Sequence, residues 1–264
     1  MNKLGIIGLG KMGNSILEGI ISSGIYKKED IILALHSEAK LQKYDEEGYN
    51  VTLNNEDVFM DSEIILVSVK PQAFDEACNT AKKYDFKGKC IISIMAGVKI
   101  ETLETYFKNA SIFRTMPNTP ALIKNGVTTV TTNVENKYQD IVLDIFNSIG
   151  KAYMITEDLM DASLPLNGSM PAYLYLFAKI FIEMGAKNGI EYETSKNLTA
   201  ESIIASANMI LQSNDSIDTL INNVCSKGGT TIAGLYELYD NNFEEAIKKC
   251  YEACVNRSIE LSKK

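Results

Sequence analysis

The start of the chain holds the residue pattern with the clearest chemical meaning, because an apolar run leads directly into Gly8-x-Gly10-x-x-Gly13. In such a motif the first glycine permits a tight turn, the second lets the backbone approach a pyrophosphate, and the third lets a helix pack on a strand. The following helix offers free N–H groups and its positive dipole end to phosphates. This context favours a dinucleotide site over a plain glycine-rich turn. The expected contacts are Ile7, Gly8, Leu9, Gly10, Lys11, Met12 and Gly13.

The end of the second predicted strand, Ile31–Leu35, decides which dinucleotide fits. A carboxylate there binds the ribose hydroxyls of NAD, whereas its absence leaves room for the 2′-phosphate of NADP. His36 and Ser37 follow the strand, and Lys40 adds a third donor. We therefore expect NADP(H) as the cofactor, while Glu38 keeps NAD(H) open. An exposed loop residue without a role is the alternative interpretation of His36.

Three short loops with Pro or Gly follow other predicted strands: Val69-Lys70-Pro71, Met95-Ala96-Gly97 and Met116-Pro117-Asn118. The carboxyl ends of parallel strands share one edge of a sheet, which is where ligands bind in such folds. Pro and Gly also simply end strands and begin helices, so the common placement of the loops carries the argument. It predicts cofactor contacts from Val69, Lys70, Pro71, Ala96, Gly97 and Asn118.

A second glycine turn, Gly228-Gly229-Thr230-Thr231, opens a predicted helix in the C-terminal part of the chain. Backbone N–H groups, two hydroxyls and the positive helix end suit a carboxylate, although an ordinary Thr-capped turn has the same composition.

The residues available for proton transfer bear on the reaction type. Carbonyl reduction needs a proton donor at oxygen, whereas a protonated imine accepts hydride at carbon without one. The single histidine, His36, belongs to the nucleotide side, and the C-terminal part lacks the Lys-x-x-Asn-Asn pattern of hydroxyacid dehydrogenases. C=N reduction is therefore favoured, although Tyr173, Tyr175 and Lys179 can still donate a proton.

Hydrophobic periodicity shows which elements position these residues. In the first part of the chain, apolar runs typical of strands alternate with helical patterns, as in a parallel doubly wound sheet. The predicted strands are Lys3–Ile7, Ile31–Leu35, Ile64–Val69, Cys90–Met95, Ser111–Arg114, Val127–Thr131 and Ala152–Ile155. The predicted helices between them are Lys11–Ser23, Gln72–Tyr84, Ile100–Phe107 and Glu135–Ile149. The helices predicted after them are Pro171–Asn188, Thr194–Gln212, Ser216–Val224, Thr230–Tyr239 and Phe243–Leu261.

We therefore predict an α/β Rossmann-type doubly wound sheet followed by an all-α dimerisation domain. The dinucleotide-binding domain is placed at residues 1–156, and the helical dimerisation and substrate domain at residues 157–264. The first long helix of that domain is apolar on more than one face, as in 172–178 and 180–182. We expect a second subunit to cover these faces, with burial in a compact bundle as the alternative.

The overall composition excludes several classes of protein. The net charge is −8, the pI is about 4.9, and no Lys/Arg run is interleaved with aromatic residues, so nucleic acid is not an expected partner. The chain has no stretch of ~20 apolar residues and no cationic leader, so we expect a cytoplasmic protein outside the membrane. Five cysteines without a Cys-x-x-Cys pair suggest neither disulfides nor a metal.

The order and spacing of the motifs resemble the pyrroline-5-carboxylate reductase family over essentially the full chain. The matching segments are Gly8–Gly13, Val69–Pro71, Ser93–Val98, Arg114–Ala121, Gly168–Tyr173 and Gly228–Thr231. The resemblance implies NAD(P)H-dependent reduction of 1-pyrroline-5-carboxylate, a cyclic imino acid, to L-proline. It also implies a homodimer with the substrate at the dimer interface, and possible assembly of dimers into a ring of five.

The resemblance further implies roles for individual residues. Thr231 would be the catalytic residue that hydrogen-bonds the substrate nitrogen, and N–H groups around Gly229 would hold the substrate carboxylate. Asn55 would contact the cofactor. The substrate-binding residues that it implies are Glu157, Asn223, Gly228, Gly229, Thr230 and Thr231.

Three positions depart from the family pattern. Met170 adds bulk where glycine is usual, Lys227 adds a cation where proline is usual, and Asn214-Asp215-Ser216 replaces a common Glu and Pro. These changes keep two alternatives open, a reductase of another cyclic imine and a non-catalytic paralogue that binds dinucleotide and dimerises. A hydroxyacid dehydrogenase is the third alternative.

Overall fold

The structure is a computed structural model that describes residues 2–135 and 137–262. Residues 1, 136 and 263–264, which fall in the predicted domains and in the predicted helix Glu135–Ile149, lie outside the described residues. The chain forms two compact units. The first unit is Met1–Pro171 together with Val255–Lys264, and the second unit is Ala172–Cys254. The predicted domain boundary between residues 156 and 157 stays a prediction.

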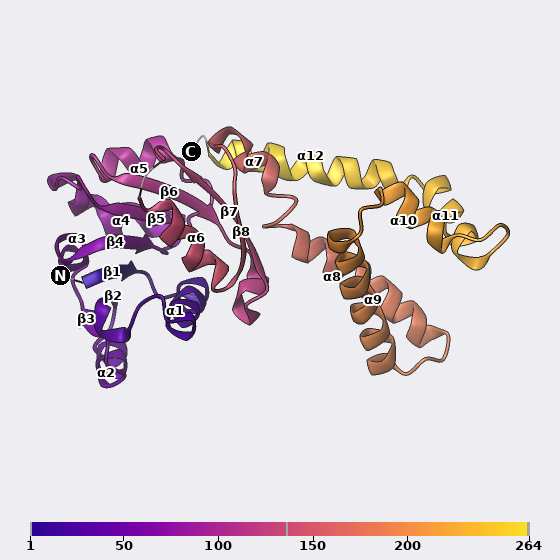
Figure 1. The fold of residues 1–264 in the computed structure, drawn as a ribbon, viewed down its shortest axis with the longest axis horizontal. Helices are drawn as coiled ribbons and strands as arrows, with labels where there is room; N and C mark the ends of the chain where they lie inside the picture. The colour runs from indigo at the N-terminus through magenta and orange to yellow at the C-terminus, as the bar shows by residue number, and fades with distance from the viewer. Residues whose placement is uncertain (1, 136, 263–264) are drawn as a thin grey trace. The chain divides into compact units, whose positions relative to one another are not determined.

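The first unit is built on an eight-stranded sheet with the order β3-β2-β1-β4-β5-β6-β7-β8 (Figure 1). Its strands are β1 (Asn2–Ile7), β2 (Ile31–Ala34), β3 (Asn50–Thr52), β4 (Ser62–Val67), β5 (Cys90–Ser93), β6 (Ser111–Met116), β7 (Gly126–Thr132) and β8 (Gly150–Met154). β2 pairs with one edge of β1, and β4, which follows later in the chain, pairs with the other edge. This switch point leaves a crevice at the carboxyl ends of these strands, where ligands bind in α/β sheets.

Helices pack on both faces of the sheet, which explains why its central strands are almost continuously apolar. They are α1 (Lys11–Ser23), α2 (Glu38–Glu46), α3 (Asn55–Asp61), α4 (Phe74–Cys78), α5 (Ile100–Tyr106), α6 (Gln139–Asn147) and α7 (Met160–Ser163). Ile6 of β1 lies in register between Leu33 and Leu66, in a core cluster with α1 and α6. The next residue, Ile7, belongs with Ile65 to a second cluster that contains α3, α4 and α5. The β1–α1 turn is thus anchored by two separate layers of core.

The sheet is not parallel throughout, which corrects the expectation of a parallel sheet. β7 runs antiparallel to β6, with Arg114 opposite Thr131, and β8 runs parallel to β7. The link between β6 and β7 covers only residues 117–125 and contains the 3₁₀ helix η4 (Thr119–Ile123). A parallel neighbour needs a crossover of about a dozen residues or more, so this short link returns the chain in the opposite direction.

Short elements account for the other differences from the sequence prediction. β3, α2 and α3 were not predicted, and α2 buries none of its residues, so it has no strong apolar face. The predicted helix Gln72–Tyr84 is divided into η2 (Pro71–Ala73), α4 and η3 (Asn79–Lys83). Hydrophobic periodicity needs a window of about 11 residues or more, which these pieces do not fill.

The second unit is formed by long helices. These are α8 (Met170–Lys187), α9 (Tyr192–Gln212), α10 (Ile217–Val224), α11 (Thr230–Asp240) and α12 (Phe243–Leu261), of which α8 and α12 also contribute residues to the first unit. Large apolar side chains remain exposed on them within this single chain, for example Leu176, Phe181 and Leu211. None of the described helices combines the length and the apolar character that a membrane crossing requires.

Candidate functional site

A cavity of about 280 Å³ lies at the carboxyl ends of β1, β2 and β4, at the switch point of the sheet. Its lining residues are Gly8, Leu9, Gly10, Ala34, Leu35, His36, Lys40, Ser68, Val69, Lys70 and Ala73. The glycine motif, the end of the second strand and the Val-Lys-Pro loop therefore meet around one cavity, as their placement at strand ends predicted. Four lining residues were not among the predicted contacts: Ala34, Leu35, Ser68 and Ala73.

Ser68 has a visible structural role in this cavity. Its hydroxyl donates to the Gly8 carbonyl and, at 3.2 Å, to the Ile7 carbonyl. The bond joins the end of β4 to the β1–α1 turn. The predicted strand Ile64–Val69 ran two residues too far and so placed Ser68 inside the sheet, which is why the sequence analysis missed it.

The glycines of the β1–α1 turn test whether a dinucleotide fits here. A Cβ at Gly8, whose φ is +90°, would lie 2.8 Å from the Val69 nitrogen, and a Cβ at Gly13 would lie 2.6 Å from the Gly8 carbonyl oxygen. Packing therefore requires glycine at these two positions. A Cβ at Gly10 would meet no protein atom within 4 Å. Open space at Gly10 is what a bound pyrophosphate needs, so the residues present fit the predicted cofactor.

Polar groups follow β2 at one end of the cavity. Ser37 N-caps α2, where its side chain accepts a hydrogen bond from the Lys40 nitrogen at 3.4 Å. His36 and Lys40 are exposed and line the cavity, and none of its lining residues that the structure describes carries a carboxylate. Glu38 is the first residue of α2. Within the described part of the chain, this end of the cavity thus presents an imidazole and an ammonium group and no carboxylate.

Two predicted cofactor contacts have side chains that already take part in the fold. The Asn118 amide donates to the Asn167 carbonyl at 3.1 Å, and its oxygen accepts from the Val127 nitrogen at 2.8 Å. The Asn55 amide donates to the Ala77 carbonyl at 2.9 Å. The Asn118 bonds join the loop after β6 to β7 and to the segment before α8, and the Asn55 bond joins α3 to α4.

The other predicted contacts, Gly13 and Ser37 among them, do not line the cavity. Ile7 ends β1, Lys11 and Met12 begin α1, Pro71 begins η2, and Ala96 and Gly97 follow β5.

The second glycine turn lies in the second unit and leads into α11. Gly228 has φ +71°, and Gly229 is the N-cap, where a Cβ would collide with Ser226 Oγ. The Gly229 N–H donates to the Ser226 carbonyl at 2.9 Å, so it is occupied within the turn. The first turn of a helix has no internal acceptors for its N–H groups, which leaves those of Thr230 and Thr231 for a ligand. Both threonines are exposed.

Two buried cysteines and the acidic side chains bear on nucleophilic and metal chemistry. Burial raises the pKa of the Cys78 thiol to about 12 and also raises the pKa of the Cys90 thiol, so neither is a thiolate at neutral pH. Among residues 2–135 and 137–262, no group of three or more His, Cys, Asp or Glu side chains is arranged to hold a metal ion.

Comparison with known proteins bears on both parts of the chain. A family model described as pyrroline-5-carboxylate reductase dimerisation matches residues 157–261, and one described as NADP oxidoreductase, coenzyme F420-dependent, matches residues 3–97. The chain is 34% identical to pyrroline-5-carboxylate reductase 2 of Bacillus subtilis, over 99% of this chain and 95% of that protein. The chain belongs to the pyrroline-5-carboxylate reductase family.

Further members of the pyrroline-5-carboxylate reductase family are similar to this protein along nearly the whole chain. Identity to the Escherichia coli pyrroline-5-carboxylate reductase is 32%, over 99% of this chain and 98% of that protein. The crystal structure of the Plasmodium falciparum enzyme with NADP bound is 34% identical, with a TM-score of 0.87 and coverage of 99% and 98%. The Coxiella burnetii enzyme is 29% identical, with a TM-score of 0.90 and coverage of 100% and 99%. The predicted fold class is confirmed.

Membership in the pyrroline-5-carboxylate reductase family also confirms the coarser functional predictions. The chain is an oxidoreductase that uses a nicotinamide cofactor, and its C-terminal helices form a dimerisation domain.

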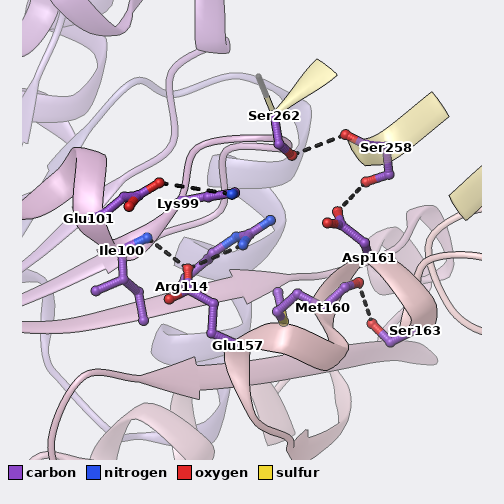
Figure 2. A network of polar contacts seen from close by, with 10 residues as sticks. All are labelled: Lys99, Ile100, Glu101, Arg114, Glu157, Met160, Asp161, Ser163, Ser258 and Ser262. Atoms are coloured by element: carbon purple, nitrogen blue, oxygen red, sulfur yellow. Dashed lines mark hydrogen bonds and ion pairs between the residues drawn. The ribbon is translucent and has the colours of Figure 1, made fainter. Parts of the chain in front are cut away.

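Glu157, predicted to bind substrate, has a defined place within the first unit of this reductase. It begins η5 (Glu157–Leu159), and its Oε1 accepts from the Ile100 nitrogen at 2.8 Å and from Arg114 Nη1 at 3.3 Å (Figure 2). Arg114 is only 4% exposed. The carboxylate therefore joins β6, η5 and the start of α5.

Proposed function

We propose that this protein reduces 1-pyrroline-5-carboxylate to L-proline with NAD(P)H. When bound, the cofactor supplies a hydride. The hydride adds to the C=N carbon of the protonated imine, and the iminium nitrogen becomes the amine of proline. The observation that carries the proposal is the full-length similarity to curated pyrroline-5-carboxylate reductases at 32–34% identity.

For the cofactor we propose contacts from the cavity at the switch point and from the neighbouring strand ends. The proposed residues are Ile7, Gly8, Leu9, Gly10, Lys11, Met12, Gly13, His36, Ser37, Asn55, Val69, Lys70, Pro71, Ala96, Gly97 and Asn118. His36, Ser37 and Lys40 favour NADP(H), because they offer donors where a carboxylate would repel a 2′-phosphate. NAD(H) is the alternative.

For the substrate we propose a site that uses the start of α11. The N–H groups of Thr230 and Thr231 would hold the carboxylate at the positive end of the helix, and the Thr231 hydroxyl would bond the ring nitrogen. Glu157, Asn223, Gly228 and Gly229 complete the proposed set. The protein's part in catalysis is then orientation of a protonated imine, with no general acid.

The proposal extends to the assembly and the cell. We propose a homodimer with the substrate at the dimer interface, and assembly of these dimers into a ring of five. We also propose a domain boundary between residues 156 and 157 and a cytoplasmic location.

The deciding experiment measures cofactor oxidation by the purified protein with pyrroline-5-carboxylate, using NADPH and NADH in parallel. We expect turnover with both and a higher kcat/KM with NADPH. Thr231→Ala should lower kcat/KM for the imine by roughly tenfold to a hundredfold, because the substrate loses its orienting bond. Thr231→Ser, which keeps the hydroxyl, should retain most activity.

Two results would redirect the assignment. Turnover confined to the six-membered imine piperideine-6-carboxylate would indicate a related reductase with altered specificity, which the bulk of Met170 and the charge of Lys227 motivate. NADPH binding without turnover of either imine would indicate the non-catalytic paralogue.

A further inference from the structure

Residues 96–99 form the second part of the loop between β5 and α5, and they are held from two sides by groups outside the cofactor cavity. On one side, the nitrogen of Ile100, the first residue of α5 directly after the loop, donates to Glu157 Oε1 at 2.8 Å. On the other side, a Cβ built on Gly97 would lie 3.9 Å from the backbone carbon and oxygen of Leu261. The last turn of α12 therefore lies against Gly97, although it is more than 160 residues away in the chain.

A partly buried hydrogen bond joins this last turn of α12 to α7. Ser258 is only 8% exposed, and its hydroxyl lies 2.5 Å from Asp161 Oδ1 in α7 (Figure 2). A hydroxyl that donates to a carboxylate forms a charge-assisted bond, which is short and stronger than a neutral one. Met160, next to Asp161, is 4% exposed, so α7 is itself anchored in the core of the first unit.

The same contacts form a closed path around the loop. α7 follows η5 directly, and Glu157 at the start of η5 binds both the buried Arg114 and the end of the loop. From α7 the path continues through Asp161 and Ser258 to α12, and from Leu261 back to the loop at Gly97. All of these residues belong to the first unit. The loop is thus positioned by one connected set of contacts.

We propose that Asp161 and Ser258 are positioning residues that hold the last turn of α12 against the 96–99 loop. The proposal rests on the proposed function, in which Ala96 and Gly97 lie beside the cofactor. Neither positioning residue lines the cavity at the switch point. Their loss therefore changes the position of this loop and leaves the pyrophosphate contacts of the glycine motif intact.

α12 contributes residues to both units of the chain. Residues 243–254 of the helix belong to the second unit and residues 255–261 to the first. One continuous helix therefore carries residues of the dimerisation domain and also supports a loop of the cofactor domain. Reaction rates are sensitive to misplacement of about 1 Å, so support of this loop bears on hydride transfer.

The test uses Ser258→Ala and Asp161→Ala in the full-length protein. We expect kcat with pyrroline-5-carboxylate to fall roughly fivefold to tenfold in both, because the loop beside the cofactor is less well oriented. The Kd for NADPH should stay within about twofold, because phosphate contacts dominate its binding. Amide hydrogen exchange in the 96–99 loop should become faster in the cofactor-free protein.

Matched variants separate positioning from general destabilisation. Asp161→Asn keeps an acceptor for the Ser258 hydroxyl and should restore kcat to near the wild-type value. Ser262→Ala removes a hydroxyl in the same turn that donates only to the Ser258 carbonyl, at 3.0 Å, and should leave kcat and loop exchange unchanged. The kcat of the double variant Asp161→Ala/Ser258→Ala should be no lower than that of either single variant, because each single substitution already removes the same Asp161–Ser258 hydrogen bond.

The proposal is overturned if Ser258→Ala and Asp161→Ala leave loop exchange unchanged, or if Asp161→Asn is as impaired as Asp161→Ala. If kcat falls only in proportion to the fraction of folded protein, and amide exchange in the 96–99 loop is no faster, the two residues have a purely structural role. That result would also overturn the proposal. Failure of the proposed function is recognised separately, because the wild-type protein would then not turn over the imine while the exchange measurement remains valid.

Discussion

The three glycines of the β1–α1 turn serve different purposes, although the motif presents them alike. Gly8 and Gly13 are required by protein atoms that surround them, whereas Gly10 faces open space. Only the Gly10 position is therefore explained by a ligand rather than by packing.

This distinction predicts different effects of the same substitution. Gly13→Ala should lower the free energy of unfolding by about 1–3 kcal/mol in the cofactor-free protein, because its Cβ overlaps the Gly8 carbonyl oxygen. Gly10→Ala should leave the cofactor-free stability near that of the wild type but raise the Kd for NADPH about tenfold, equivalent to 1.4 kcal/mol. Urea denaturation and cofactor titration measure the two quantities. A Gly10→Ala protein with unaltered NADPH affinity would contradict the placement of the pyrophosphate.

At the scale of elements, the Arg114–Glu157 pair joins β6 to η5 and to the start of α5. Arg114 is almost fully buried, whereas the Glu157 side chain is 35% exposed. A buried guanidinium without its partner is costly, and partial exposure of the carboxylate reduces that cost.

Glu157→Ala should therefore lower the free energy of unfolding by about 2 kcal/mol, because Arg114 loses its partner and the Ile100 N–H loses its acceptor. Urea denaturation with NADPH absent measures the change. The double variant Arg114→Met/Glu157→Ala is the control and should recover part of the loss, since no buried charge remains. If the Glu157→Ala protein has wild-type stability and differs only in a raised KM for the imine, the main role of Glu157 is substrate binding.

At the scale of the whole molecule, the exposed apolar side chains of the second unit require a partner. Leu176, Phe181 and Leu211 are 60%, 53% and 77% exposed in the single chain. Large exposed apolar patches on soluble proteins mark interaction surfaces. The match of residues 157–261 to a dimerisation family model supports the proposal that this partner is a second copy of the chain.

Phe181→Asp should accordingly weaken the dimer, because a charge placed in an apolar interface loses its hydration. Sedimentation velocity over a range of protein concentrations should show a shift from dimer toward monomer, with a parallel loss of imine turnover if the substrate site needs both subunits. Lys187→Asp, which changes a charged residue in the last turn of the same helix, is the control and should leave the dimer intact. A Phe181→Asp protein that stays dimeric would place the interface elsewhere.

Long, strongly patterned elements were predictable because their signals are local. The observed bounds of α12 and of α1 are the same as the predicted bounds at both ends. The glycine motif needed only a strand before it and a helix after it. Short or exposed elements such as α2 and β3 carry too few apolar residues for such a signal. β3 forms by pairing with β2 at the edge of the sheet, and α2 places only the partly buried Leu41 and Tyr44 against the core.

The sequence by itself determined the fold class, the family and the types of residue available for binding, because periodicity and motif spacing are encoded among near neighbours in the chain. Only the tertiary structure decided which distant residues meet. Strand order brings Ser68 against Gly8, the short β6–β7 link sets an antiparallel pair, and α7 brings Asp161 to Ser258, 97 residues away. Such contacts depend on how whole elements pack, and no local pattern of residues records that arrangement.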